Sequence, residues 1–477
     1  MPVRFILNGE PCEESAVSPS MTVLDYLREQ RGFKGTKEGC AEGDCGACTI
    51  VTASVRDGRL DYEAANACLM LVPQLDGKEI ITVEGLAERD GTPHAIQQAL
   101  VAGHGSQCGF CTPGIVMALF AFHHSGDPVE TEKIHDALAG NLCRCTGYRP
   151  IVDAALTLDQ NPSDRFAREA EAKTASIQGL ALSDSYDFDH ETFHAPQSLD
   201  ALLRLRAAYP DAYLLGGGTD LGILASKDRK RFGRVIWTAL VPELARIERT
   251  ETQITIGAAV TYTAALPLFD ELYPSFANII RRIGSRQIRN LGTLGGNVCN
   301  ASPIGDMPPC LLVLEATFIA RSVGGVREIP ADAFFVGYRK TALAEDEILE
   351  AIRIPMPQPD TIYQAHKVSK RFDQDISAVI GAFALTIRNG TVEKARVAFG
   401  GMAATPARAI KCEATLEGAP WNAATADSAG AALNSDFSPI SDFRASGDYR
   451  RRIAANLVRR VFEETGNSTT LTDVMAL

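Results

Sequence analysis

The residues with the clearest chemistry are four cysteines near the N-terminus, Cys40, Cys45, Cys48 and Cys68. The spacing C-x4-C-x2-C with a distant fourth cysteine is the plant-type arrangement for a [2Fe–2S] cluster, in which two irons and two sulfides leave four positions for thiolates. Glycines between the cysteines let backbone N–H groups turn toward the sulfurs and tune the reduction potential. A structural zinc site is the alternative, but such sites usually show two short C-x2-4-C pairs, so the spacing predicts an iron–sulfur cluster.

A second group of cysteines precedes two expected helix starts, at Thr112-Pro113 and at Pro150. If these helices pack about a pseudo-twofold axis, the two cysteine pairs converge, and the positive helix ends stabilise thiolates and sulfide. The pattern predicts a second four-thiolate cluster; the alternative is a C-x-x-C redox disulfide with an unrelated pair nearby. The cysteines of this group are Cys108, Cys111, Cys143 and Cys145.

Two glycine-rich segments are candidates for phosphate binding. Gly216-Gly217-Gly218-Thr219-Asp220 follows an expected strand at 212–215, where backbone N–H groups could face a phosphate, although a tight turn explains this segment alone equally well. It is not G-x-G-x-x-G, so a Rossmann domain is a weak interpretation. With the second segment, 289–297 followed by 302–306, the pair suits a pyrophosphate-bearing dinucleotide, and FAD is the leading ligand.

The elements that position these residues predict a multidomain α+β protein. Asn8-Gly9 between two alternating runs predicts a hairpin, and Thr22 with Asp25 opens a helix ending near Gly32, the order of a ferredoxin β-grasp. Helices are expected from residue 86, at 198–207 and at 448–464, and strands at 364–368 and 376–387. We expect a [2Fe–2S] ferredoxin domain at 1–85, a helical-bundle [2Fe–2S] domain at 86–158, a linker at 159–190, an FAD-binding domain at 191–358 and a C-terminal α+β domain at 359–477.

Composition limits the classes of partner. The chain has 477 residues, of which 45% are hydrophobic, and a formal net charge of −12. An acidic chain is poorly suited to nucleic acid or to an anionic membrane surface. The N-terminus has no signal-peptide core and the apolar run near Gly114 to Phe122 is too short to span a bilayer, so we expect a cytoplasmic protein. In that compartment clustered cysteines are metal ligands or reactive thiols rather than disulfides.

Taken together, the motifs resemble the xanthine dehydrogenase family of molybdenum hydroxylases over nearly the whole chain. Besides the first four cysteines, the segments QCGFCTPG, GNLCRCTGYRP, LGGGTDL, RNLGTLGGN, SPIGD and FFVGYRKT occur in the family's order. The arrangement is similar to the small, iron–sulfur and FAD subunit of bacterial members. The resemblance implies a non-Rossmann FAD-binding domain of the vanillyl-alcohol-oxidase/CO-dehydrogenase flavoprotein type.

By resemblance, Cys108, Cys111, Cys143 and Cys145 hold the cluster nearer molybdenum, and the other four cysteines hold the cluster nearer the flavin. Ile283 occupies a position where some relatives place an aromatic ring near the flavin, and Tyr338 lies where relatives approach NAD. The residues that the resemblance assigns to FAD are Leu214, Leu215, Gly216, Gly217, Gly218, Thr219, Asp220, Leu221, Ile283, Thr293, Asp306, Leu349 and Lys367.

The resemblance also implies a function in purine metabolism. Hypoxanthine or xanthine is hydroxylated at a molybdopterin cofactor on a separate large subunit, and this chain passes the electrons through two [2Fe–2S] clusters to FAD and then NAD. No catalytic side chain is expected here, and the family's assembly is a dimer of heterodimers, a heterotetramer. The alternatives are the same module of an aldehyde or N-heterocycle hydroxylase, oxygen in place of NAD as acceptor, and a non-enzymatic zinc-binding scaffold.

Overall fold

The computed structural model describes residues 1–466 and 472. The chain forms two compact units, and neither is continuous in sequence. The first unit contains residues 1–198, 211–240 and 284–292, and the second contains 199–210, 241–283 and the chain from 293 onward. Each unit is described by itself below.

A five-stranded sheet in the order β2-β1-β5-β3-β4 begins the first unit. The Asn8-Gly9 hairpin is confirmed, because both residues have the positive φ, 54° and 91°, that a tight hairpin turn requires. Thr22 accepts a hydrogen bond from Asp25 N at 3.1 Å, so the predicted helix cap is confirmed. The elements are β1 (Val3–Leu7), β2 (Glu10–Glu14), α1 (Val23–Asp25), η1 (Tyr26–Gln30), β3 (Thr49–Arg56), β4 (Arg59–Asn66), η2 (Val72–Leu75), β5 (Glu79–Ile81) and η3 (Val83–Gly85).

Four helices follow and share a core with this sheet. They are α2 (Ala95–Ala102), α3 (Thr112–His123), α4 (Thr131–Leu138) and α5 (Arg149–Ala155). Every residue of α3 from Gly114 to His123 is buried, and the apolar members pack with Val51 and Ala53 of β3 in one hydrophobic cluster. This explains why α3 is apolar on all sides.

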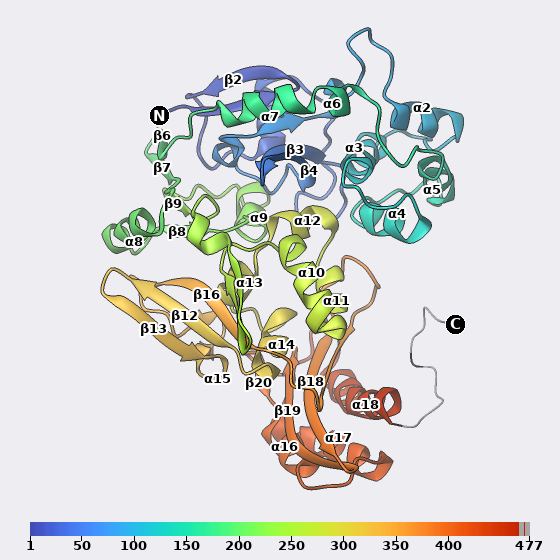
Figure 1. Cartoon of the computed structure of the whole chain (residues 1–477), viewed down its shortest axis with the longest axis vertical. Coiled ribbons are helices and arrows are strands. Elements are labelled where there is room, and N and C mark those ends of the chain that lie inside the picture. Colours follow the sequence, from blue (N-terminus) through green and yellow to red (C-terminus); the bar gives the residue numbers. More distant parts are fainter. Residues whose placement is uncertain (467–471, 473–477) are drawn as a thin grey trace. The chain divides into compact units, whose positions relative to one another are not determined.

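The segment expected to be a linker, 159–190, is folded onto the sheet. It contains α6 (Arg165–Arg168) and α7 (Ala170–Gln178), and Figure 1 shows α7 lying over the ferredoxin strands. Phe166 is 1% exposed, and Lys173 Nζ lies 2.5 Å from Glu79 Oε1 inside the unit. The charged residues of this segment predicted a solvent-exposed linker, but one of them, Lys173, is buried and stabilised by its ion pair with Glu79.

A small mixed sheet completes the first unit. Its strands, in the order β6-β7-β9-β8, pack Phe193 and Trp237 against Leu69 and Leu71 of the ferredoxin part. The elements are β6 (Ser185–Phe188), β7 (Glu191–His194), β8 (Tyr213–Leu215), α9 (Leu221–Ser226), β9 (Arg234–Trp237) and α12 (Arg286–Leu291).

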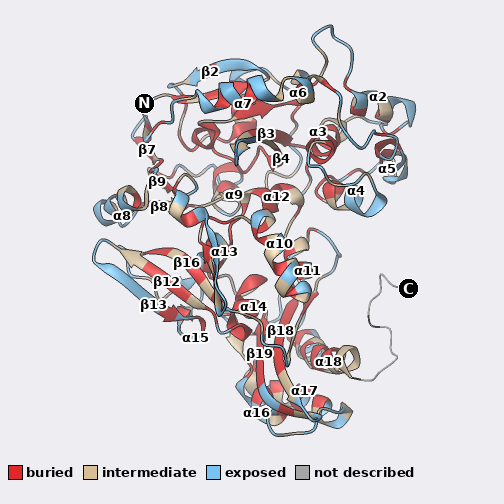
Figure 2. Ribbon diagram, viewed as in Figure 1, coloured by how far each residue is buried: buried red, intermediate tan, exposed pale blue. Residues whose placement is uncertain are grey.

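The second unit has two sheets, in the orders β10-β11-β16-β12-β13 and β17-β18-β19-β20. Figure 2 shows β18 and β19 buried along most of their length, where α16 to α18 cover them. The elements are α8 (Leu199–Ala208), η4 (Pro242–Ala245), β10 (Ile247–Arg249), β11 (Gln253–Gly257), α10 (Tyr262–Leu272), α11 (Pro274–Arg281), α13 (Leu294–Asn300), α14 (Met307–Val313), β12 (Thr317–Ser322), β13 (Gly325–Pro330), α15 (Ala331–Phe334), β14 (Phe335–Gly337), β15 (Lys340–Thr341), β16 (Ile348–Pro355), β17 (Thr361–Val368), β18 (Val379–Arg388), β19 (Thr391–Gly400), β20 (Ala407–Arg408), α16 (Ile410–Leu416), α17 (Ala423–Asp436) and α18 (Gly447–Thr465).

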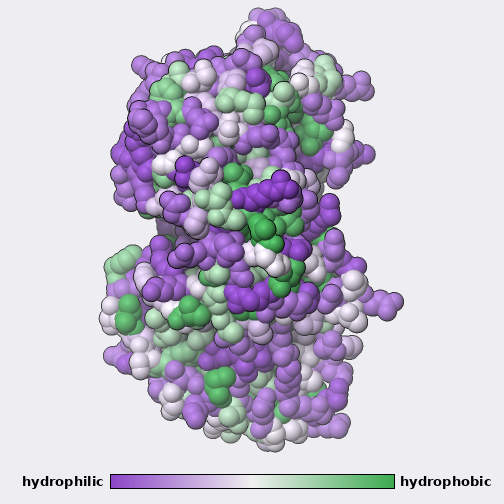
Figure 3. Space-filling view, turned by 90° about the vertical axis from the view of Figure 1, so that its left-hand side faces the viewer, coloured by the Kyte–Doolittle hydropathy of each residue, from purple (hydrophilic) through white to green (hydrophobic). Residues whose placement is uncertain are grey.

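No helix within the described residues combines the length and the apolar character needed to cross a membrane. On the face drawn in Figure 3, hydrophilic residues predominate and apolar residues lie among them in small groups.

Candidate functional site

The first set of predicted cluster ligands lies in the loop before β3 and just after β4. These residues are Cys40, Cys45, Cys48 and Cys68. Cys48 directly precedes β3 and Cys68 follows β4 by one residue, and the register that pairs Thr49 with Asn66 brings these two cysteines together. Their Sγ atoms are 3.3 Å apart. The side chains of Cys40 and Cys45 also lie close enough for each to shift the pKa of the other. The four thiols therefore form two pairs, which is the set that two sulfide-bridged irons need.

Backbone N–H groups of the cysteine loop point at these sulfurs. Glu42 N donates to Cys40 Sγ at 3.4 Å. The contact with the Cys45 thiol and the backbone N–H groups of Glu42, Cys45 and Asp44 lower the pKa of Cys40, although burial opposes the shift, and the same contact raises the pKa of Cys45. Gly46 has φ +67° and lets the loop pack closely against the segment before Cys143, because a Cβ there would lie 2.2 Å from Gly140 O. A loop that stabilises thiolates in this way fits an iron–sulfur cluster.

The second set of predicted ligands also converges. Cys111 directly precedes α3, and Cys143 and Cys145 lie in the turn before α5. The backbone N–H of Phe110 and the side chain of Cys145 lower the pKa of Cys108, and burial and the side chain of Cys143 raise the pKa of Cys111, so Cys108 lies near Cys145 and Cys111 near Cys143. Each pair has one member from each motif, so the two helix starts meet as the sequence predicts. Thr112 is the first residue of α3 rather than its cap, one position from the expected boundary.

The second set has two exposed thiols and one buried thiol, Cys143, whereas the first set has two buried thiols and none that is exposed. Cys108 and Cys145 are exposed, but Cys48 and Cys68 are buried. Around the exposed pair, Phe110 is 48% exposed and Leu142 46%. Apolar side chains around a redox centre are suited to contact with a protein partner.

One hydrogen bond connects the two sets directly. Leu142, which precedes Cys143, donates its N–H to the carbonyl oxygen of Cys45 at 2.9 Å. Beside it, Asn141 Nδ2 donates to Gly46 O at 3.0 Å. A ligand of each set is therefore linked to the other through bonded atoms and one hydrogen bond.

In the first unit, the glycine run 216–218 lies between β8 and α9. A Cβ on Gly217 would lie 1.6 Å from Leu291 O of α12, so only glycine fits there. Trp237 Nε1 donates to Gly216 O at 3.1 Å and fixes the turn from the other side. Of the neighbouring predicted residues, Leu215 is buried, Asp220 is exposed, and Leu214, Thr219 and Leu221 are half-buried.

In the second unit, Thr293 caps α13 by accepting a hydrogen bond from Gly296 N at 2.9 Å. The Oδ1 atom of Asn297 in the same helix is buried and has no hydrogen-bond partner among the described residues. Because buried acceptors normally have a hydrogen-bond partner, the Oδ1 atom of Asn297 beside this glycine-rich helix start fits a site for a polar ligand. Asn297 lies in the predicted segment, although no motif marks it as a ligand.

Asp306 and Lys367, both predicted flavin ligands, contact each other. Lys367 Nζ lies 2.6 Å from Asp306 Oδ2, and Ser377 Oγ donates to Asp306 Oδ1 at 2.5 Å. Lys367 Nζ also donates to Arg282 O at 2.9 Å. Ser377 and Arg282 were not predicted as neighbours of this pair, because no sequence motif links them to Asp306.

The remaining predicted flavin residues of the second unit are apolar. Leu349 on β16 is 5% exposed, and Ile283 packs half-buried against the same core. The side chain of Ile283 is aliphatic, so it can contact a flavin ring through its methyl groups but cannot stack on it as an aromatic ring would.

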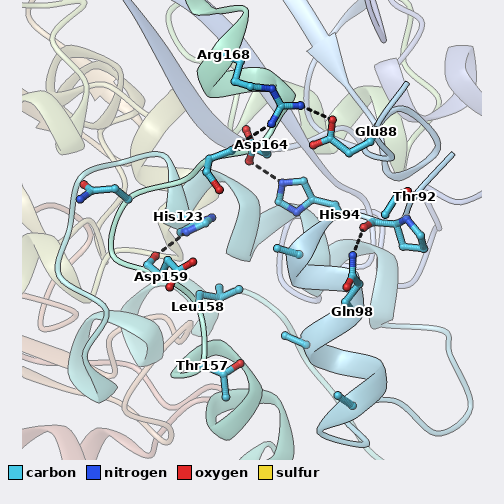
Figure 4. Close-up of a pocket in the computed structure, with 16 residues that line it drawn as sticks. Glu88, Thr92, His94, Gln98, His123, Thr157, Leu158, Asp159, Asp164 and Arg168 are labelled. Carbon is cyan, nitrogen blue, oxygen red and sulfur yellow. Dashed lines mark hydrogen bonds and ion pairs between the residues drawn. The ribbon is translucent and has the colours of Figure 1, made fainter. Parts of the chain in front are cut away.

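A polar cavity of about 500 Å³ lies in the helical part of the first unit. Figure 4 shows His94 pointing at Asp164 on its wall. His94 Nε2 and His124 Nε2 lie 2.7 Å and 2.8 Å from Asp164 Oδ2, close enough for three metal ligands. However, His94 Nδ1 accepts a hydrogen bond from Ile96 N at 3.3 Å, so Nε2 carries the proton and donates it to Asp164. A metal-binding imidazole needs an unprotonated nitrogen, so these residues form a structural hydrogen-bond network.

Four protein-family models match most of the chain. Residues 5–73 match the "2Fe-2S iron-sulfur cluster binding domain" and 82–156 the "[2Fe-2S] binding domain". Residues 186–357 match the "FAD binding domain in molybdopterin dehydrogenase", and 364–465 match the "CO dehydrogenase flavoprotein C-terminal domain".

Similar proteins include several xanthine dehydrogenases. The chain is 34% identical to xanthine dehydrogenase of Emericella nidulans over 97% of its own length, and 35% identical to xanthine dehydrogenase 1 of Arabidopsis thaliana over 84%. It spans only 38% and 35% of those two relatives.

Two solved structures resemble part of the chain. Carbon monoxide dehydrogenase from Hydrogenophaga pseudoflava aligns with a TM-score of 0.54 at 29% identity, over 56% of this chain and 94% of that one. Quinoline 2-oxidoreductase from Pseudomonas putida 86 aligns with a TM-score of 0.54 at 27% identity, over 58% and 97%. The chain thus contains two [2Fe–2S] domains and an FAD-binding domain of the kinds found in molybdenum hydroxylases.

Proposed function

We propose that this chain is the electron-transfer subunit of a xanthine dehydrogenase, carrying electrons from a molybdenum site on a partner subunit to NAD. The observation that carries the proposal is the convergence of eight cysteines into two sets of four, in a chain whose other domains are flavoprotein domains. The xanthine dehydrogenases named above support the choice among molybdenum hydroxylases.

The two cysteine sets are the proposed cluster ligands, Cys40, Cys45, Cys48 and Cys68 for one cluster and Cys108, Cys111, Cys143 and Cys145 for the other. When bound, the clusters supply one-electron transfer and FAD supplies the change from single electrons to a hydride for NAD. The cysteine loop holds its thiolates with backbone N–H groups, and Leu142 bridges the two sets through its hydrogen bond to Cys45 O.

FAD is proposed to bind the residues assigned to it from the sequence. Gly217 leaves room for a backbone approach, and Thr293 with Asn297 offers polar groups at the start of α13. Lys367 and Ser377 hold Asp306 in one orientation. For NAD, Tyr338 on the β14–β15 hairpin is 64% exposed, which suits a residue that meets a diffusible acceptor.

The proposed partner is a separate large subunit that carries molybdopterin. The exposed Cys108 and Cys145, with apolar Phe110 and Leu142 beside them, offer a surface for that contact. We also propose a dimer of two such heterodimers in the cytoplasm, where reduced thiols persist. Sedimentation of the co-expressed complex tests the assembly, and a single heterodimer would contradict it.

A second candidate is the same module in another molybdenum hydroxylase. The similarity to quinoline 2-oxidoreductase and carbon monoxide dehydrogenase structures favours this alternative, because the flavoprotein fold is shared by enzymes with different substrates.

The decisive experiment uses the complex of this chain with its molybdenum-containing partner. Xanthine should reduce NAD, and oxygen should be the poorer acceptor. If the complex turns over quinoline, nicotinate or an aldehyde but does not turn over xanthine, the second candidate is favoured. A colourless, zinc-containing preparation without flavin after anaerobic handling would contradict both.

A further inference from the structure

The helix that follows the glycine run also contacts the first cysteine loop. At the end of α9, the last helical residue Ser226 donates from Oγ to Ala41 O, and the next residue, Lys227, donates from Nζ to Glu42 Oε2. Arg229 adds an ion pair of 2.8 Å with Asp25. One short helix therefore carries the proposed flavin turn at its start and a contact to the cysteine loop at its end.

The contact places a positive charge beside a predicted cluster ligand. Glu42, which holds Lys227, is the residue whose N–H donates to Cys40 Sγ at 3.4 Å. The hydrogen bond with Glu42 raises the pKa of Lys227, and the negative charges of Cys40 and Asp44 contribute. Glu42 and Asp44 add two acidic residues to the segment that follows Cys40, and the ammonium group of Lys227 offsets part of this negative charge.

We infer that Lys227 is a positioning residue that raises the reduction potential of the cluster held by Cys40, Cys45, Cys48 and Cys68. The inference rests on the proposed function, because it needs that cluster. Reduction adds one electron to the cluster and breaks no bond, so nearby positive charge favours the reduced form and uncompensated negative charge disfavours it.

The charge pair is partly open to solvent, which limits the effect and makes it sensitive to salt. The side chains of Lys227 and Glu42 are 42% and 37% exposed. Removing the lysine should lower the ratio of reduced to oxidised cluster at a fixed potential by about threefold to tenfold, and a tenfold change equals about 59 mV for one electron. Raising the ionic strength should reduce the difference between variant and wild type.

The test is a redox titration of the full chain with its clusters loaded, reduced stepwise with dithionite and followed by electron paramagnetic resonance. Lys227→Gln should lower the potential of the first cluster, Glu42→Gln should raise it, and the double variant should lie near wild type. Lys227→Arg keeps the charge and should restore the wild-type value. The second cluster is an internal reference whose potential should stay constant.

Lys230→Gln is the matched control. Lys230 lies three residues further along the same segment but donates to Tyr213 Oη at 2.6 Å, so its removal should leave the first cluster unchanged. An unchanged or raised potential in Lys227→Gln would overturn the inference. If Lys227→Gln fails to retain the cluster, a potential in Glu42→Gln that does not rise would overturn it. A wild-type chain with no cluster signal would instead contradict the proposed function.

Discussion

Cys68 is the one proposed ligand of the first set that lies outside the loop 40–48, and the β3–β4 register brings it to Cys48. Replacing Cys68 with serine removes a thiolate from the first set and leaves the second set intact. We expect Cys68→Ser to bind about two irons per chain instead of about four, with the signal of the second cluster retained. Iron and sulfide analysis with electron paramagnetic resonance measures this.

Cys299→Ser is the control, because Cys299 is an exposed cysteine of α13 that belongs to neither set. It should keep the full iron content. Full iron in Cys68→Ser would show that the first set does not hold a cluster as proposed.

At the scale of residues, the sequence predicted the two cysteine sets, but not that Asp306 pairs with Lys367 and accepts a hydrogen bond from Ser377. The spacing of the cysteines in the sequence indicates a cluster, because a cluster requires fixed distances between its thiolate ligands. The pairing of Asp306 with Lys367 joins residues 61 positions apart, and its geometry depends on tertiary packing alone. Nothing in the local pattern around Ser377 marks it as a donor to that carboxylate.

At the scale of elements, Asp164 joins three helices. Its Oδ1 accepts from Ala167 N at 3.0 Å and so caps α6, and its Oδ2 contacts His94 before α2 and His124 after α3. Burial alone would raise the pKa of Asp164, but the hydrogen bonds from His124 and His94 hold it well below its ordinary value of 3.8.

A carboxylate with a lowered folded-state pKa stabilises the fold above its unfolded pKa, and this stabilisation is lost as the pH falls through the folded value. At pH 7 we therefore expect Asp164→Asn to be less stable than wild type by about 1–3 kcal/mol. The difference should narrow below the ordinary value of 3.8, where the unfolded group begins to take up a proton. Denaturant unfolding across this pH range measures it.

The exposed Asp228 provides a matched variant, because Asp228→Asn should leave stability unchanged at every pH. A constant difference between Asp164→Asn and wild type down to strongly acid pH would contradict the explanation.

Gly217 allows the turn between β8 and α9 to touch α12. Gly217→Ala places a methyl group 1.6 Å from Leu291 O, so the turn must move. We expect FAD content to fall at least tenfold, roughly 1.4 kcal/mol or more in binding, while both iron–sulfur signals remain. Flavin absorbance of the purified chain measures this.

Gly324→Ala is the control, because the nearest atom to its added Cβ would be Ser322 Oγ at 3.4 Å, an ordinary contact. Full flavin content in Gly217→Ala would count against a role for the glycine run.

Elements with strong local signals were predictable. The Asn8-Gly9 hairpin and the cap at Thr22 have turn and capping chemistry in adjacent residues. The helices α6 and α7 were not, because few apolar residues mark their buried face and a lysine occupies part of it. Lys173 is stable there through Glu79, a partner on a distant strand.

At the scale of the whole molecule, the first unit is completed by two late segments. Residues 211–240 and 284–292 contribute Leu215, Trp237 and Leu291 to the core that contains Leu69. A fragment of residues 1–198 lacks these segments, so it should lose cluster absorbance at a lower temperature than the full chain. Thermal melts followed in the visible range compare the two, and equal midpoints would contradict this prediction.

Domain families are continuous in sequence, whereas the compact units are not. The sequence predicted the boundary near residue 191 from a change in composition, and the family match at 186–357 lies close to it. That match covers residues of both units, because β8 and β9 belong to the first and β11 to the second. Composition along the chain carries no signal for such a division, which depends on contacts between distant segments.

The discontinuity also has a consequence for synthesis on the ribosome. The cysteines of both sets emerge before residue 146, but the core beneath the cysteine loop is closed only when α12 has left the exit tunnel. Translation proceeds at about 5–20 residues per second, so for at least several seconds the cysteines are already synthesised while the core that supports their loop is incomplete. Insertion of the proposed clusters is therefore expected only once α12 has emerged and docked onto this core.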